Sequence, residues 1–265
     1  MVVDKINSFL SESREVNDPV RLELIKNLFT HCFQRQFLTD KKRDSGKLYL
    51  SSCGKCPRQL AYSFHDYEPL GKTIDSRSRI TFFVGDTLEI MTTQLAQISG
   101  CDLTDTGFEQ KTVSVIVEGK EVFGHPDGIL DKNILFECKS MSSFAFKDFE
   151  KGEIDDDYLA QVNIYMHALG LKKCVIVAVC KDSGVLGEQV INYDENIAKL
   201  ALENMALVLK STKENLPKGR YTFDEKTGFY PFNCLYCGFW GHCKPNAKKV
   251  VVKNAYKLKE KGETK

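Results

Sequence analysis

The feature that most constrains the fold is an apolar run ending in two opposite charges, Ile134-Leu135-Phe136-Glu137-Cys138-Lys139. In an extended strand alternate side chains share a face. Glu137 and Lys139 therefore point to one side, while the alternate apolar side chains point to the other. A carboxylate and an ammonium on so apolar a strand are costly to bury without partners. A hard divalent cation and a phosphodiester would together give both charged groups partners. Asp127, ten residues earlier, supplies a second carboxylate.

The alternative is an ordinary surface pair, since an Asp and an E-x-K triplet often occur together by chance on an edge strand. A second feature favours a site. A helix is expected over 158–170, and Gln161 and Tyr165, four residues apart, share one of its faces. There they could hydrogen-bond a nucleic acid, or they could be two unexceptional polar positions of an amphipathic helix. Asp155, Asp156 and Asp157 are interpreted as helix-start residues that favour the dipole, not as metal ligands.

The cysteines form the next feature. Cys234, Cys237 and Cys243 follow a C-x2-C-x5-C spacing that brings three thiols together. The chain has ten cysteines and no secretory signal is visible, so metal ligation in a reducing compartment is favoured over disulfides. Five other cysteines lie singly in apolar or helical runs and are interpreted as small buried side chains: Cys32, Cys101, Cys138, Cys174 and Cys180.

A closed structural site needs a fourth ligand from elsewhere in the chain. The other cysteine cluster is Cys53-Gly54-Lys55-Cys56. Cys56, directly before Pro57-Arg58 and a short helical run, is the predicted ligand, and Cys53 is the alternative. Such a site would join the N-terminal and C-terminal parts of the chain. Zinc is the generic ion for four cysteines, and spacing alone does not exclude it.

Five motifs occur in a fixed order, and together they resemble a known family. They are Cys56-Pro57-Arg58, Gly124-x-x-Asp127, Glu137-x-Lys139, Gln161-x-x-x-Tyr165 and Cys234-x2-Cys237-x5-Cys243. In this order they resemble the PD-(D/E)XK nucleases of the RecB type. More narrowly, the chain looks like the iron-sulfur branch that contains the AddB nuclease domain and the small nuclease of the CRISPR adaptation machinery. The resemblance covers roughly residues 50 to 245.

The resemblance implies a role for each motif. Asp127 and Glu137 would bind a catalytic Mg²⁺ or Mn²⁺ together with the backbone carbonyl of Cys138, and Lys139 would orient or help deprotonate the attacking water. Gln161 and Tyr165 would help hold the substrate and the active site. The remaining implied cofactor is a [4Fe-4S] cluster, held by Cys56, Cys234, Cys237 and Cys243.

One position departs from the family pattern. Many relatives carry a Gly-x-x-x-His metal ligand on a helix before the Asp motif, whereas the corresponding run here begins at Gly85 and ends at Glu89. A carboxylate also binds a hard cation, so Glu89 is predicted as a further metal ligand, the third carboxylate of the site. The alternative is a solvated helix residue.

Composition agrees with a globular protein in which charge is unevenly placed. The 265 residues are 42% hydrophobic and 28% charged, with a net charge of +1. No apolar run has membrane-spanning length, and a cytoplasmic location is expected. Residues 244–265 contain eight lysines and two glutamates. This basic tail could follow a phosphate backbone, or it could be a solvated, disordered end.

The periodicity of apolar residues predicts an α/β fold. Helices are expected over 18–38, 80–98, 144–150, 158–170 and 196–209, and strands over 112–117, 121–123, 134–139, 174–179 and 188–193. This order suits a mixed central sheet flanked by helices, which is also the restriction-endonuclease-like core that the resemblance implies. The expected regions are an N-terminal helical region (1–75), a nuclease core (76–215), an iron-sulfur region (216–246) and a basic tail (247–265).

The sequence thus predicts a metal-dependent DNA exonuclease that hydrolyses phosphodiester bonds at single-stranded ends, with a structural [4Fe-4S] cluster. The resemblance suggests 5′ to 3′ polarity. A DNA-binding adaptor of a recombination or CRISPR adaptation complex, with little or no cleavage, is the alternative, and a zinc-stabilised interaction module is a third reading. No membrane contact is expected. Homo-oligomers and recombination or CRISPR partner proteins remain open.

Overall fold

The computed structural model describes residues 1–12, 16–39, 45–70, 76–253 and 255–261. Its centre is a five-stranded sheet in the order β1-β4-β5-β6-β7. β5 and β6 are parallel, and the other neighbouring pairs are antiparallel. The strands are β1 (Leu103–Thr104), β4 (Gly128–Leu130), β5 (Ile134–Met141), β6 (Lys173–Cys180) and β7 (Leu186–Asn192). The mixed central sheet predicted from the sequence is therefore confirmed.

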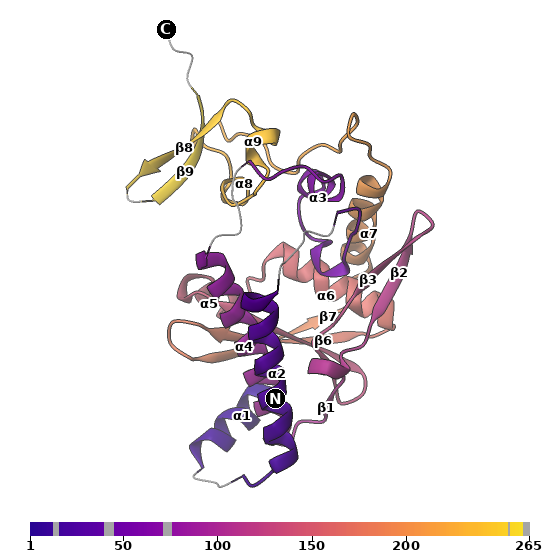
Figure 1. Ribbon diagram of the computed structural model, residues 1–265, viewed down its shortest axis with the longest axis vertical. Helices are drawn as coiled ribbons and strands as arrows, with labels where there is room; N and C mark the ends of the chain where they lie inside the picture. The colour runs from indigo at the N-terminus through magenta and orange to yellow at the C-terminus, as the bar shows by residue number, and fades with distance from the viewer. Residues whose placement is uncertain (13–15, 40–44, 71–75, 254, 262–265) are drawn as a thin grey trace.

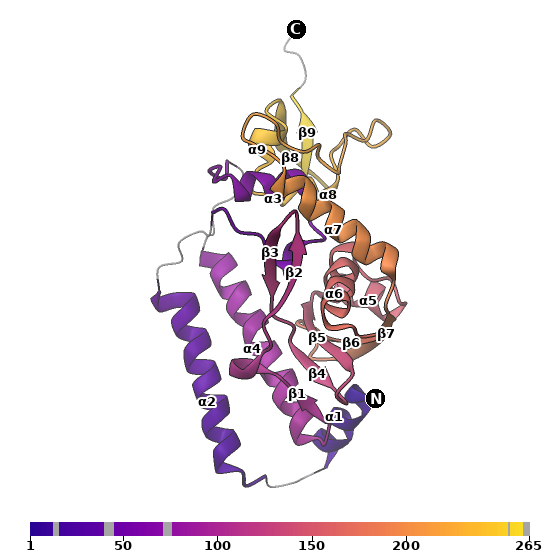
Figure 2. The same cartoon turned by 90° about the vertical axis from the view of Figure 1, so that its right-hand side faces the viewer.

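Helices cover both faces of this sheet (Figures 1 and 2). One face packs against α5 (Ser143–Glu150), α6 (Asp156–Leu169) and α7 (Glu195–Leu209), in a core that includes Leu135 and Ile176. The other face packs against α1 (Val2–Ser11) and α4 (Ser76–Ile98). Strand residues alternate between the two cores, so β6 carries a nearly continuous apolar run, while β5 is apolar only as far as Phe136 before its charged residues begin.

The second long helix predicted from the sequence, 80–98, is α4, which begins slightly earlier at Ser76. The predicted helix over 18–38 is α2 (Pro19–Phe33), continued by a π-helical turn (Gln34–Leu38). Asp18 caps α2, because its side chain accepts a hydrogen bond from the Arg21 backbone N–H. α2 packs beside α4 on the outer side of the molecule (Figure 2).

The predicted hairpin over 112–123 is also present. β2 (Val113–Val117) and β3 (Lys120–Gly124) pair with each other, and Tyr49 bridges to Phe123. Within the sheet and the helices that cover it, α1, β1 and β4 were not predicted. β1 and β4 are only two and three residues long, too short to show a period of two. α1 buries Val2, Val3 and Ile6 against the sheet.

The cysteine-rich region lies at one end of the molecule (Figure 1). It contains α3 (Pro57–Phe64), α8 (Phe232–Leu235), α9 (Trp240–Cys243), and the hairpin of β8 (Ala247–Val252) and β9 (Ala255–Glu260). α3 joins this region to α7 through Leu60, Ala61 and Val208. The expected basic tail is thus a folded hairpin as far as it is described, because Ala247 and Leu258 pack against Leu235.

Candidate active site

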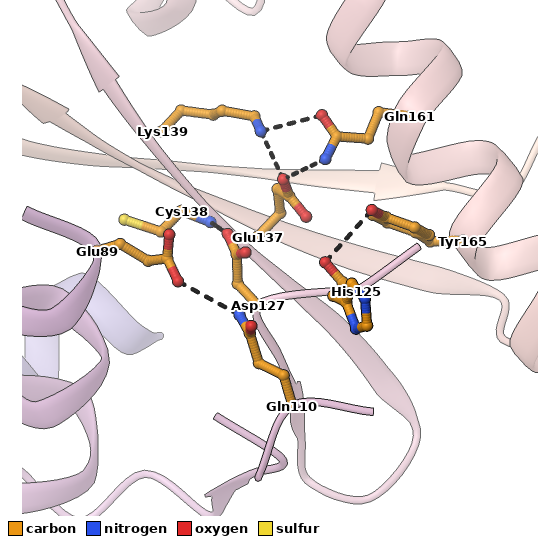
Figure 3. A network of polar contacts seen from close by, with 9 residues as sticks. All are labelled: Glu89, Gln110, His125, Asp127, Glu137, Cys138, Lys139, Gln161 and Tyr165. Carbon is orange, nitrogen blue, oxygen red and sulfur yellow. Dashed lines mark hydrogen bonds and ion pairs between the residues drawn. The ribbon is translucent and has the colours of Figure 1, made fainter. Parts of the chain in front are cut away.

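Glu137 and Lys139 share one face of β5, as the alternation of the strand predicts (Figure 3). Glu137 is only 1% exposed. The Lys139 Nζ donates to Glu137 Oε1 at 2.5 Å, and the Lys139 side chain is 15% exposed. Phe136 and Cys138 lie in the core on the opposite face. The strand therefore holds an ion pair at the base of the site.

Gln161 on α6 completes a triangle with this pair. Its Nε2 donates to Glu137 Oε1 at 2.8 Å, and its Oε1 accepts from Lys139 Nζ at 3.1 Å. All polar contacts of Glu137 thus fall on Oε1. The other oxygen, Oε2, is buried and has no hydrogen-bond partner among the described residues. A buried carboxylate oxygen without a partner is costly, so we expect this atom to bind a ligand.

Asp127 lies between Glu137 and Glu89 (Figure 3). Its Oδ2 accepts a hydrogen bond of 2.8 Å from the backbone N–H of Cys138, which fixes the carboxylate against β5. The side chain is buried. Burial raises the pKa of Asp127 well above its ordinary value, and the charges of Glu137 and Glu89 raise it further. These carboxylates therefore repel one another across a shared space.

Glu89 comes from the middle of α4 and faces the same space, so it is not a solvated helix residue. Its Oε1 accepts a hydrogen bond of 3.3 Å from Gln110 Nε2. Burial raises the pKa of Glu89 to about 7, with further contributions from Glu137 and Asp86. Gln110 was not predicted as a site residue, and a lone glutamine between a short helical turn and a strand carries no sequence signal.

Lys139 is the cation that partly balances these three carboxylates. Burial acts to lower the pKa of Lys139, but the charges of Glu137 and Asp127 outweigh it and raise the pKa above its ordinary value. The ammonium also lies 5.0 Å from the centre of the Tyr158 ring. Lys139 is therefore held in its charged form. One positive charge remains insufficient for three acidic groups in a site of low dielectric constant.

Tyr165 is buried beneath the segment that leads to Asp127. The side chain is 1% exposed, and its hydroxyl donates to the backbone carbonyl of His125 at 3.3 Å. The reason is the close approach of β3, since Gly124 lies directly against the Tyr165 ring. Tyr165 therefore supports the segment that carries Asp127, and Gln161 alone of the pair faces the charged residues (Figure 3).

The acidic residues converge without forming a closed metal site. Within the described parts of the chain, no three His, Cys, Asp or Glu side chains are arranged to hold an ion. The donor chemistry nevertheless fits a hard divalent cation, which prefers carboxylate oxygens. Glu137 Oε2 has no hydrogen-bond partner in the described part of the chain, and the repulsion between Asp127, Glu137 and Glu89 would be relieved by a positive ion.

The predicted cluster cysteines line a second site. Cys56, Cys234, Cys237 and Cys243 all border one pocket beneath α3, α8 and α9. Its remaining wall includes the aromatic rings of Tyr62, Tyr221 and Trp240 and the cations Arg58 and Lys244. Cys53, the alternative ligand, is instead completely buried in the main core. The segments predicted to join at the cysteines are thus neighbours.

No protein-family model matches the chain, and no curated protein matches it either. Among solved structures, SSO0001 is similar with a TM-score of 0.53 and 19% identity, over 84% of this chain and 97% of that chain. An alkaline exonuclease (LHK-Exo) from Laribacter hongkongensis gives a TM-score of 0.43 at 17% identity, over 69% of this chain and 92% of that one. A phage-related exonuclease from Haemophilus somnus 129PT gives 0.40 at 11% identity, over 66% and 95%. The similarity to SSO0001 is one of fold. The TM-scores of the two exonucleases are too low to establish even a shared fold.

Proposed function

We propose that the protein is a divalent-metal-dependent deoxyribonuclease that acts as an exonuclease on single-stranded DNA ends. The observation that carries the proposal is the buried Glu137 carboxylate, whose Oε2 has no partner in the described structure while Asp127, Glu89 and Lys139 surround it. A protein that only binds DNA does not need this arrangement. The order of the five sequence motifs supports the same conclusion.

The proposed roles combine the contacts at the site with those that the sequence resemblance implies. Asp127 and Glu137 would hold Mg²⁺ or Mn²⁺ together with the backbone carbonyl of Cys138, and Glu89 would add a third carboxylate. When bound, the ion supplies Lewis acidity and lowers the pKa of water for attack on the phosphodiester. Lys139 places a positive charge where negative charge develops on the phosphate oxygens. Gln161 orients both Glu137 and Lys139, because it hydrogen-bonds to each of them.

The thiol pocket is proposed to hold a [4Fe-4S] cluster through Cys56, Cys234, Cys237 and Cys243. All four thiols border one pocket, yet no three cysteines within the described ranges are placed to bind a single ion. A tetrahedral zinc ion would require all four sulfurs at about 2.3 Å from one point, whereas each corner of a four-iron cluster takes one thiolate. Four thiols suit either group; the order of the five sequence motifs supports the cluster, and zinc is the alternative.

An anaerobic preparation tests the cofactor. We expect a brown protein with visible absorption, and iron and sulfide in equal amounts. Cys56→Ala should lose that absorption, whereas Cys53→Ala should keep it, since Cys53 does not border the pocket. A colourless protein that contains zinc would reject the iron-sulfur cluster and leave the nuclease proposal standing.

The nuclease activity is tested with end-labelled single-stranded, duplex and circular DNA in Mg²⁺ or Mn²⁺. We expect cleavage of linear single strands and intact circles, with release of the label from the 5′ end first. Glu137→Gln and Lys139→Ala should each lower the rate at least about 100-fold while folding is retained. Glu203→Gln, on an exposed position of α7, should match the wild type. DNA binding without cleavage by the wild type would instead support the adaptor.

A further inference from the structure

Arg220 lies between the thiol pocket and the start of α6, and it contacts both. Its backbone N–H donates to Cys56 Sγ at 3.3 Å. Its guanidinium donates to the carbonyl oxygens of Gly54 at 2.6 Å and Lys55 at 3.4 Å, and forms an ion pair with Asp157 Oδ1 at 3.6 Å. One side chain therefore joins the loop that carries a pocket cysteine to the first turn of α6.

The same loop is packed directly onto α6. A Cβ atom placed on Gly54 would lie 2.5 Å from the Cα of Asp157 and 2.8 Å from its carbonyl oxygen. These are backbone atoms, which cannot move aside without moving the helix. The Gly54 segment and the first turn of α6 therefore shift together, and Arg220 attaches the pocket to both.

α6 carries Gln161 one turn beyond Asp157, at the i, i+4 spacing. Gln161 donates to Glu137 and accepts from Lys139. A continuous series of contacts thus runs from Cys56 through Arg220 and the start of α6 to the candidate catalytic pair. The planar guanidinium suits this position, because its rigid fork of donors reaches two carbonyls and a carboxylate that lie apart, whereas the donors of a lysine all lie on one nitrogen atom.

We propose that Arg220 is a positioning residue that makes the placement of Gln161, and hence of Glu137 and Lys139, depend on the state of the thiol pocket. This inference rests on the proposed nuclease function. When the four thiols are held together, Arg220 fixes the Gly54 loop and the first turn of α6. When the group they hold is lost, α6 loosens at its N-terminal end and Gln161 no longer orients the pair.

The test compares Arg220→Gln and Arg220→Lys with Lys218→Gln. Lys218 is an exposed cation in the same segment, so this control removes the same charge without the contacts. In the anaerobic protein without DNA, we expect Arg220→Gln to keep its iron content and to speed hydrogen exchange in the first two turns of α6. On single-stranded DNA, kcat should fall about tenfold with KM within about twofold. Arg220→Lys should be intermediate, and Lys218→Gln should equal the wild type.

Removal of the pocket's inorganic group gives a second measurement. Stripping the wild type with an iron chelator should speed exchange in α6, whereas stripping Arg220→Gln should add little, because the two changes act through one contact series. Fully additive effects would overturn the proposal. Unchanged hydrogen exchange of α6 in Arg220→Gln would also overturn it. So would a loss of activity in this variant that is fully explained by a loss of iron. A wild type that never cleaves DNA would reject the proposed function, and the exchange measurements would still decide the role of Arg220.

Discussion

The two oxygens of Glu137 have different surroundings, and this difference defines the candidate site at the level of single residues. Oε1 accepts from both Lys139 and Gln161, whereas Oε2 has no partner among the described residues. Lys139 and Gln161 thus hold the carboxylate in one orientation before any ligand binds. Preorganisation of this kind lowers the cost of binding, since little side-chain freedom remains to be lost.

The pKa of Glu89 leads to a prediction about pH. Burial, followed by the charges of Glu137 and Asp86, raises this pKa from 4.5 to about 7, while Lys139 and Arg35 act in the opposite direction. A carboxyl group with a raised folded-state pKa contributes stability that is complete below the unfolded value and is lost as pH rises through the folded value. In the absence of divalent ions, the free energy of unfolding should therefore fall between pH 4.5 and pH 7.

Urea unfolding at several pH values, after divalent ions are chelated, measures this effect. Glu89→Gln should reduce the loss by roughly 3 kcal/mol, and part of the loss should remain because the pKa of Asp127 is raised as well. Added Mg²⁺ should restore stability above pH 7 in the wild type. An equal pH slope in Glu89→Gln and the wild type would show that Glu89 does not titrate in this way.

Some of these residue positions could be predicted from the sequence and others could not. The period of two along β5 is enough to place Glu137 and Lys139 on one face. The i, i+4 spacing places Gln161 and Tyr165 on one side of a helix, but it does not reveal how closely Gly124 approaches the Tyr165 ring. That contact depends on the path of β3, which is set by packing between segments distant in sequence. For this reason the contact between the Tyr165 hydroxyl and the His125 carbonyl could not be foreseen, and a substrate contact of Tyr165 stays a prediction.

At the scale of elements, β3 and α6 meet at Gly124, and this contact fixes the segment that leads to Asp127. A Cβ on Gly124 would lie 2.6 Å from Tyr165 Cε1 and 2.8 Å from the Leu50 Cβ. Gly124→Ala should therefore destabilise the protein by about 1–3 kcal/mol, because neither buried neighbour can move away freely. The shift should also displace Asp127 and lower activity.

Gly85→Ala is the matched control for this substitution. Among the described residues, a Cβ on Gly85 would meet only Ser140 Oγ, at an ordinary distance of 3.6 Å. Since Gly85 lies inside α4, alanine should be neutral or stabilise the helix by up to about 1 kcal/mol. Chemical denaturation of both variants measures the difference. Equal stability of Gly124→Ala and Gly85→Ala would contradict the close contact between β3 and α6.

Elements with long apolar periods, such as α4, α6, α7, β5 and β6, could be predicted to within a few residues. The C-terminal hairpin could not, because its lysines dominate the sequence pattern. Its fold depends on two positions, Ala247 and Leu258, which are buried against Leu235. In sequence these are single apolar residues among charges, and their burial is a consequence of the cysteine-rich region beside them.

At the scale of the whole molecule, charge is divided between the two ends. Residues 216–261 contain ten basic and three acidic side chains, whereas the whole chain has a net charge of only +1. The cysteine-rich end is therefore strongly positive and the remainder is net acidic. An acidic site repels a phosphate backbone until it holds cations, so the basic end would provide the attraction that brings DNA to the protein.

No described helix combines the length and apolar character needed to cross a bilayer.

The β8-β9 hairpin contributes three lysines on its outward face. Lys248 pairs across the ladder with Lys259, and Lys257 pairs with Val250, so all three lie on the side opposite the buried Leu258. Binding of single-stranded DNA releases counterions in proportion to the phosphates contacted. Changing all three lysines to glutamine should therefore weaken binding at low salt and reduce the slope of log K against log salt by about 2.

This substitution is preferable to deletion of the hairpin, which would expose the apolar surface beneath Leu258. A matched control changes three exposed lysines of the nuclease core, Lys132, Lys173 and Lys199, to glutamine. Fluorescence anisotropy of labelled single strands over a range of salt concentrations, in Ca²⁺ to limit cleavage, measures both variants. If the hairpin directs DNA, only the first variant loses slope. An equal loss in both variants would mean that the total charge of the molecule governs binding, and that the hairpin is merely a solvated surface.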